Sequence, residues 1–217
     1  MLDSHTAVHV PAEPGVTTTL VLLHGTSGDE RQLLDLGRML APGAGLLGIR
    51  GNVREGGANR WFRRLAAGVF DTEDVITRAD ALGGYLDAAI PAHDLDPSGL
   101  LAIGFSNGAN IGAALLLRRP DLLRGGVLVS SMRPFTPEVA PDLTAAAVLM
   151  LQGRGDPHAP PEEAEALATL LTDAGAAVHL RWHDDGHALG PAQATQARDW
   201  VTRWQAGTAA DPDRSPA

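Results

Sequence analysis

The stretch "AIGFSNGAN", residues 102–110, places a serine between two glycines where an apolar run meets a helix-like segment. A serine that projects from a sharp strand-to-helix turn has an unfavourable backbone conformation, and side chains two residues to either side would collide with the neighbouring strand and helix. Gly104 and Gly108 lack those side chains. The pattern therefore predicts that Ser106 is an exposed nucleophile, and a plain glycine-rich turn is the alternative.

The rest of the chain alternates short apolar runs with longer segments of helical period. The apolar runs predict strands buried on both faces, at 18–23, 45–49, 100–104, 126–130, 146–152 and 178–182. Helices are predicted at 72–90, behind an acidic start, and at 161–174, which opens with a proline. This alternation predicts an α/β fold with a mostly parallel central sheet and helices on both faces.

Chain length, composition and net charge limit the number of domains and the kinds of partner. A chain of 217 residues that is 44% hydrophobic can bury one substantial core, which predicts a single domain over 1–205. The end "AGTAADPDRSPA", 206–217, is small, polar and proline-bearing, so a disordered tail is expected there. A formal charge of −9 argues against nucleic acid or an anionic membrane as a partner. No signal peptide or membrane span is evident, so a cytoplasmic location is expected.

Two missing residue types restrict the chemistry. All 17 basic residues are arginines, so no lysine can form a Schiff base or serve a phosphate-binding loop. Cysteine is absent too, which excludes thiol nucleophiles, disulfides and thiolate metal sites. Covalent catalysis would have to use Ser, Thr, Asp, Glu, His or Tyr85.

Polar residues follow the predicted strands, at the edge where parallel sheets bind ligands. In chain order they supply Ser106, Asp156 and His187, the order used by hydrolases with a nucleophile elbow. Serine needs a base within hydrogen-bond reach, and the base needs a carboxylate to orient it. His187 is predicted to be that base and Asp156 that acid.

Other side chains compete for these roles. His158 is expected to face solvent, and His183 is expected to fill a packing or surface position. Asp185 is a second choice for the acid, although a carboxylate so near His187 in sequence rarely reaches the far ring nitrogen. The pair His183 and His187 has a metal-binding spacing only on a helix, and this segment is a strand end entering a glycine loop, so no metal site is predicted.

The tetrahedral oxyanion requires two backbone amides as donors. One is predicted to come from Asn107, directly after the nucleophile, and the other from Thr26 in "HGTSG", after the earlier strand. His24 is expected to shape that loop as a hydrogen-bonding residue and not to act as a base.

The stretches "LLHGTSGDE", "GFSNGANI", "GRGDPHAPPEEAE" and "HDDGHALG" resemble the carboxylesterase and phospholipase branch of the α/β-hydrolases, in particular small bacterial carboxylesterases related to acyl-protein thioesterases. The resemblance runs from about 21 to 204. It implies an α/β-hydrolase fold and hydrolysis of carboxylic esters or thioesters, without a cofactor, through an acyl-enzyme on Ser106. It also implies that a homodimer is common. Asn107 stands where the thioesterases usually carry glutamine, and His158 replaces an apolar residue.

The predicted function is therefore a carboxylesterase that acts on a small-molecule ester with small to medium acyl or alcohol groups. An acyl-thioesterase or a lysophospholipase would use the same three side chains. A catalytically silent hydrolase fold that only binds a ligand is the alternative from another class.

The sequence also predicts residues that line the substrate pocket. Residues 50–71 form a glycine-rich insertion after a strand, with five arginines and with Trp61, Phe62 and Phe70, and are expected to form a wall or short lid. In the alternative, Trp61 and Phe62 cover the edge of the core. The arginines would attract a carboxylate or phosphate, or else pair with surface acids. Met132 and Phe135 are further lining candidates in a shallow, open cleft.

Overall fold

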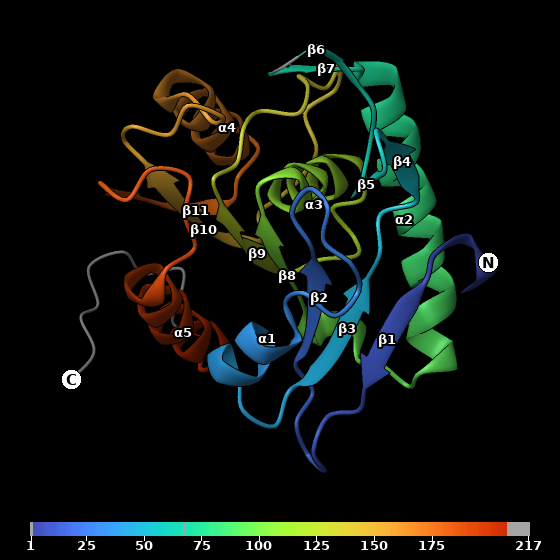
Figure 1. The fold of residues 1–217 in the computed structure, drawn as a ribbon. Helices are drawn as coiled ribbons and strands as arrows, with labels where there is room; N and C mark the ends of the chain where they lie inside the picture. The colour runs from blue at the N-terminus through green and yellow to red at the C-terminus, as the bar shows by residue number, and fades with distance from the viewer. Residues whose placement is uncertain (1, 67, 208–217) are drawn as a thin grey trace.

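The structure is a computed structural model that describes residues 2–66 and 68–207, with a seven-stranded sheet at its centre (Figure 1). The strand order is β1-β3-β2-β8-β9-β10-β11, and every pair is parallel except β1 with β3. The predicted α/β fold is confirmed. The strands are β1 (Ala7–Val10), β2 (Thr19–Leu23), β3 (Gly45–Ile49), β8 (Leu100–Phe105), β9 (Gly125–Val129), β10 (Ala147–Gly153) and β11 (Ala177–His183).

Helices cover both faces of the sheet. Helices α1 and α5 pack on one face, and α2, α3 and α4 on the other. In β2, Leu20 and Leu22 point to the first face while Val21 and Leu23 point to the second. Because both faces are covered, the strand is apolar throughout. The helices are α1 (Leu34–Leu40), α2 (Thr72–Ala92), α3 (Asn107–Arg118), α4 (Pro161–Asp173) and α5 (Pro191–Gln205), with short 3-10 turns at Leu2–Ser4 and Pro97–Gly99.

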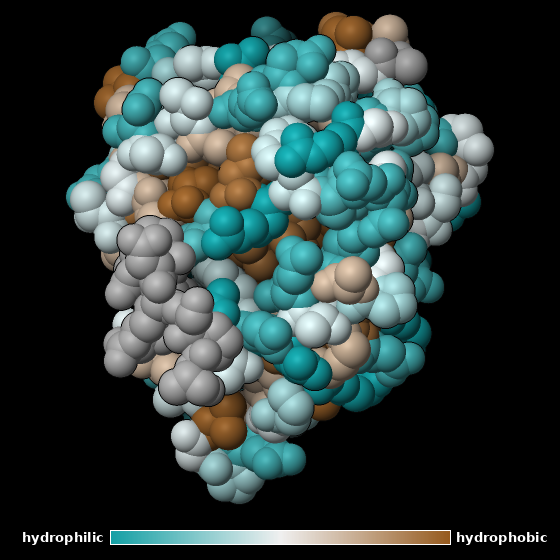
Figure 2. Space-filling view, turned by 90° about the vertical axis from the view of Figure 1, so that its left-hand side faces the viewer, coloured by the Kyte–Doolittle hydropathy of each residue, from teal (hydrophilic) through white to brown (hydrophobic). Residues whose placement is uncertain are grey.

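Strand β11 departs from the prediction that its apolar run is buried on both faces. It is the edge of the sheet and pairs only with β10, and most of its residues, Val178 and Leu180 among them, are only partly buried. Figure 2 looks at this side of the molecule and shows a small group of hydrophobic residues in a mostly hydrophilic face. An edge strand has no neighbour on one side, so α4 and α5 cover it incompletely.

Several elements have no counterpart in the sequence prediction. They are β1, α1, α5 and two hairpins within the predicted wall, which pair β4 (Val53–Glu55) with β5 (Ala58–Arg60) and β6 (Arg64–Ala66) with β7 (Val69–Phe70). Strands of two to four residues are too short to show a period. The turn of the first hairpin is Gly56-Gly57, with φ of 58° and 84°, a conformation that favours glycine.

The parallel strands all end at one edge of the sheet, where the chain leaves β2, β8, β10 and β11 toward the segments singled out by sequence. Among the described residues, no helix is long and apolar enough to cross a membrane. The predicted tail lies outside the described residues from 208 onward.

Candidate active site

Ser106 lies in the turn between β8 and α3, with φ of 53° and ψ of −117°. A residue with a side chain adopts this conformation at a cost in free energy, so the surrounding structure must impose it. A Cβ at Gly104 would lie 2.7 Å from the Cα of Ala109, and a Cβ at Gly108 would overlap the carbonyl oxygen of Leu23 in β2. The two glycines are therefore needed for the helix and the neighbouring strand to approach the turn this closely.

Three side chains from separate strand ends converge here. The Nε2 atom of His187 lies 3.0 Å from the Oγ of Ser106, and its Nδ1 lies 2.7 Å from the Oδ2 of Asp156. With Nδ1–H donating to the carboxylate, Nε2 is left to accept the hydrogen of the Ser106 hydroxyl. The arrangement is suited to removing a proton from the serine.

Asp156 is held in one orientation and in its ionised form. Its side chain is fully buried, and its Oδ1 accepts hydrogen bonds from the amides of His158 at 2.8 Å and Ala159 at 3.1 Å. Burial would raise the pKa of this carboxyl, but the amide of His158 and the ring of His187 outweigh burial and hold the pKa below its usual range.

The competing side chains are occupied elsewhere. Asp185, the second choice for the acid, accepts from the Nε2 of Gln193 at 2.6 Å and does not contact His187. His183 accepts from the amide of Asp185 at 3.3 Å. His158 is exposed, as expected, but its ring lies edge-on to that of His187 with 5.0 Å between centroids. Within the described part of the chain, no group of three or more ligand side chains could hold a metal ion.

His24 fixes the loop after β2. Its ring is buried between two backbone groups: Nδ1–H donates to the carbonyl of Gly25 at 2.6 Å, and Nε2 accepts from the amide of Gly51 at 2.9 Å. Burial lowers the pKa of His24, which keeps the ring neutral and able to accept at Nε2. The indole of Trp61 donates to the carbonyl of His24 at 2.9 Å. His24 is thus a hydrogen-bonding residue of the loop, as expected from the sequence.

The two predicted oxyanion donors, Thr26 and Asn107, both line the cleft around Ser106. The neighbouring amides of the Thr26 loop are occupied, since Gly25 donates to the side chain of Gln32 and Ser27 to the carbonyl of Asn59. Among the described residues, the amide of Thr26 has no such acceptor. Asn107 opens α3, where the first amides of a helix have no acceptor within the helix.

Comparison with known proteins identifies the family. Over 192 residues the chain is 41% identical to the protein named "Putative hydrolase MhqD" of Bacillus subtilis (strain 168), a match that covers 88% of this chain and 96% of that protein. The chain belongs to the α/β-hydrolases. A family model described as TAP-like protein also matches residues 127–214.

Solved structures agree with this assignment. The hydrolase is similar to a carboxylesterase from Bacillus cereus, with a TM-score of 0.89 and 38% identity over 92% of this chain and 94% of that chain. It is also similar to a carboxylesterase from Mesorhizobium loti, with a TM-score of 0.81 and 32% identity over 86% of this chain and 89% of that chain.

The cleft of the hydrolase opens around Ser106 and His187 and has a volume of about 1180 Å³. The β6–β7 hairpin and the segment after β9 both contribute lining residues. Three of the predicted lining residues, Phe70, Met132 and Phe135, do line it.

Trp61 and Phe62 are corrections to the predicted pocket. They are 1% and 0% exposed and belong to the core on the α2 and α3 side of the sheet. The indole of Trp61 donates to the carbonyl of His24, and the backbone amide of Trp61 donates to the side chain of Asn107 at 2.8 Å. Trp61 thus holds the loops that carry His24 and Asn107, while Phe62 packs in the core with its ring edge-on to that of Phe70.

Ser130 and Arg60 are among the cleft residues that the sequence does not single out. Ser130, at the end of β9, has φ of 53° and is buried, and Arg60 is a buried arginine that lines the cleft. The position of Ser130 after a strand at the active edge was a usable signal. Nothing in the sequence distinguishes Arg60 from the other arginines of 50–71.

Proposed function

We propose that this α/β-hydrolase is a serine carboxylesterase that cleaves carboxylic esters of small to medium acyl or alcohol groups through an acyl-enzyme on Ser106. The observation that carries the proposal is the double contact of His187, with the hydroxyl of Ser106 on one ring nitrogen and the carboxylate of Asp156 on the other. The likeness to two proteins named carboxylesterase, both above 30% identity, supports the ester as substrate.

In the first half of the reaction, His187 accepts the hydroxyl proton while the Oγ of Ser106 attacks the ester carbonyl carbon. The amides of Thr26 and Asn107 donate to the oxyanion as it forms. The imidazolium of His187, stabilised by Asp156, then donates its proton to the departing alkoxide oxygen, and the alcohol leaves.

In the second half, a water molecule takes the place of the alcohol. His187 removes one proton from this water as its oxygen attacks the acyl carbon, and returns the proton to the Oγ of Ser106 when the acyl–serine bond breaks. The acid is released and Ser106 is restored. The sequence of steps uses water as the second substrate and requires no cofactor.

Labelling by a fluorophosphonate probe tests this proposal, because only an activated serine reacts with it. We expect one label on the wild type, at Ser106, and none on Ser106→Ala. The variant Ser98→Ala, which removes an exposed serine before β8, should label as the wild type does. A wild type that is not labelled would instead favour the silent, ligand-binding alternative.

The leaving group is tested separately. A panel of acyl esters, thioesters and lysophospholipids of rising chain length, assayed on the purified protein, ranks the three substrate classes by kcat/KM. We expect esters of short and medium chains to rank first. A higher rank for thioesters would replace the carboxylesterase assignment by a thioesterase that uses the same side chains.

A further inference from the structure

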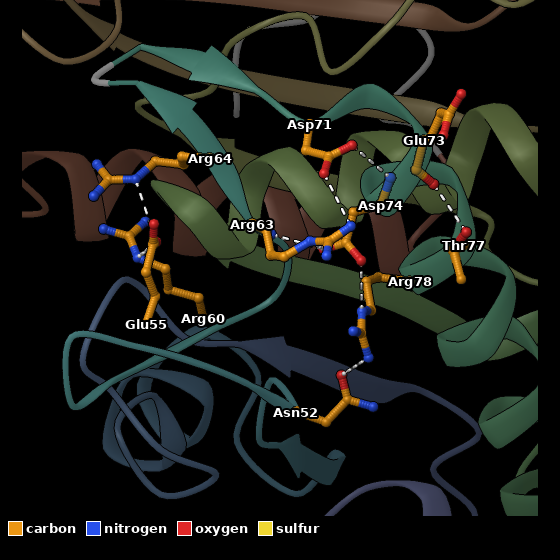
Figure 3. Close-up of polar contacts among 10 residues, drawn as sticks. All are labelled: Asn52, Glu55, Arg60, Arg63, Arg64, Asp71, Glu73, Asp74, Thr77 and Arg78. Atoms are coloured by element: carbon orange, nitrogen blue, oxygen red, sulfur yellow. Dashed lines mark hydrogen bonds and ion pairs between the residues drawn. The ribbon is translucent and has the colours of Figure 1, made fainter.

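One wall of the cleft carries more positive charge than its acids balance. The guanidinium groups of Arg60 and Arg64 share one carboxylate: the Nε of Arg60 lies 2.7 Å and the Nε of Arg64 lies 3.6 Å from the Oε2 of Glu55 (Figure 3). Among the described residues, neither arginine has another acidic partner. We call these three residues the arginine wall, which keeps one uncompensated positive charge.

The arginine between them in the sequence behaves differently. Arg63 lies 3.0 Å from a carboxylate oxygen of Asp71 and 3.6 Å from one of Asp74, and Asp74 also pairs with Arg78. Figure 3 shows this second group apart from the arginine wall. Two arginines face two acids there, so the charges balance, and the excess charge belongs to the arginine wall alone.

The charge of Arg60 is shielded little by water. Its side chain is only 8% exposed, whereas that of Arg64 is 36% exposed. Burial lowers the pKa of Arg60, and the nearby Arg64 lowers it further, against the opposing effect of Glu55. Although Glu55 is close, the Nε–H of Arg60 has no acceptor aligned for a hydrogen bond. A buried guanidinium in this state is stabilised by a further anion.

The arginine wall belongs to the cleft that contains the reacting serine. Arg60 and Arg64 line the same cleft as Ser106 and His187. The residue after Arg60 is tied to the residue after Ser106, because the amide of Trp61 donates to the side chain of Asn107. An anion bound at the arginine wall would therefore belong to the molecule whose ester group reaches Ser106.

The opposite wall does not compete for an anion. Arg133 lines it but already lies 3.5 Å from a carboxylate oxygen of Glu163, and Glu162 adds a further negative charge at the start of α4. The cleft is thus positive on the side of β5 and β6 and negative on the side of α4. This asymmetry would orient an anionic substrate.

We propose that the arginine wall binds a carboxylate of the substrate, so that the preferred esters are monoanionic, with one carboxylate on the acyl or the alcohol part. The inference rests on the proposed esterase function and narrows its substrate class. The planar guanidinium matches a carboxylate in two parallel hydrogen bonds. A monoanion neutralises the one uncompensated positive charge of the arginine wall, whereas a phosphate dianion would keep one negative charge without a partner.

Matched pairs of esters test the preference. Monomethyl glutarate and the methyl ester of glutaric acid monoamide differ only by a charge on the acyl part, and 3-acetoxypropanoate and 3-acetoxypropanamide differ by the same charge on the alcohol part. We expect kcat/KM to be at least about tenfold higher for the anion in one pair, the discrimination of one charge-assisted hydrogen bond. Equal values in both pairs would refute the inference, even for an active esterase.

Variants of the arginine wall show which residues cause the preference for the anionic ester. Arg64→Gln should reduce the anion-to-neutral ratio of kcat/KM about tenfold, and Glu55→Gln should raise it, because it removes the acid that shares the charge. Arg64 is partly exposed, so its replacement leaves the pair of buried Arg60 and partly exposed Glu55 in place. Arg38→Gln, on α1, removes an exposed positive charge far from the cleft and should keep the ratio of the wild type. A ratio abolished by Arg133→Gln but kept in Arg64→Gln would place the anion on the other wall and overturn the proposal.

Binding separates this inference from the proposed function. Calorimetric titration of Ser106→Ala with each ester measures affinity without turnover. We expect the dissociation constant of the preferred anion to be about tenfold below that of its neutral partner, and this difference to disappear when Arg64→Gln is added. Equal affinities overturn the inference, whereas a wild type that binds the anion but hydrolyses nothing would refute only the esterase function.

Discussion

The two halves of the cleft are positioned in different ways. Ser106, Asp156 and His187 stand at the ends of parallel strands, and backbone geometry and close packing fix their places. The wall over 53–70 is made of two short hairpins that are held by pairs of arginines and acids. Every residue of β6 is exposed, whereas Arg60 of β5 is buried. The contrast agrees with the proposal that the sheet positions the reacting groups, while the insertion contributes to substrate selection.

The largest effect is expected from a substitution of Asp156, the acid at the end of β10. Asp156→Asn should lower kcat for an activated ester by about a thousandfold to ten-thousandfold, because an amide no longer stabilises the imidazolium or fixes its tautomer. Asp185→Asn, the matched change on the neighbouring loop, should leave kcat within about twofold of the wild type. Steady-state kinetics on both variants decides, and a larger loss for Asp185→Asn would mean that the acid is misassigned.

The next test replaces a glycine at the strand end. Gly108→Ala puts a Cβ against the carbonyl oxygen of Leu23, which is backbone and cannot move aside, so we expect a loss of about 3 kcal/mol or more in the free energy of unfolding. Gly84→Ala is the control, because nothing lies near its Cβ in α2 and a helix gains up to about 1 kcal/mol from alanine. Chemical denaturation measures both. Equal effects would contradict the close approach of β2 to the nucleophile turn.

A smaller effect is expected where the two halves meet, at His24. His24→Ala removes the acceptor of the buried amide of Gly51 and should cost about 1–3 kcal/mol of unfolding free energy, together with part of kcat as the Thr26 loop loosens. His24→Gln supplies a side-chain oxygen and should recover part of both. If Gln does no better than Ala, the hydrogen bond to Gly51 is not what the ring provides.

The pH dependence of the free energy of unfolding distinguishes the two halves of the cleft, because each half has its own titrating group. His5 lies behind the wall, 6.4 Å from the ring of Trp61, and burial lowers its pKa to about 4, with Arg78 and the N-terminus adding to the shift. As the pH falls, His5 is protonated near pH 6.5 in the unfolded chain but only near pH 4 in the folded protein. The free energy of unfolding that neutral His5 contributes is therefore complete above pH 6.5 and is lost as the pH falls toward 4.

We therefore expect the free energy of unfolding to fall by up to about 1.4 kcal/mol per pH unit more in the wild type than in His5→Gln within that window. Asp156→Asn should nearly keep the slope of the wild type there, because the carboxyl has an ordinary pKa of 3.8 in the unfolded chain and a lower pKa in the folded protein, so most of its contribution is lost only below about pH 4. Urea titrations at a series of pH values give the slopes. Identical slopes for the wild type and His5→Gln would rule out the shift at His5.

The sequence predicts the sheet and the convergence of Ser106, Asp156 and His187 because each depends on local patterns: apolar runs, a glycine pair, and polar residues after strands. It fails at Trp61 and Phe62, since an aromatic residue in a glycine-rich segment is equally compatible with a core or a cleft position. It also cannot distinguish Arg60 from Arg63, because their difference depends on which acids fold against them.

The insertion is tied to the loops around Ser106 by three backbone groups and by two side chains, since the amide of the Asn59 side chain donates to the carbonyl of Gly28 and the indole of Trp61 to the carbonyl of His24. The amide of Gly51 reaches His24, the amide of Trp61 reaches Asn107, and the carbonyl of Asn59 receives the amide of Ser27. Side chains at positions other than these anchor points can therefore be exchanged without breaking these hydrogen bonds. A randomised library confined to positions 54–58 and 64–69 would be a direct route to retuning the selectivity of this scaffold.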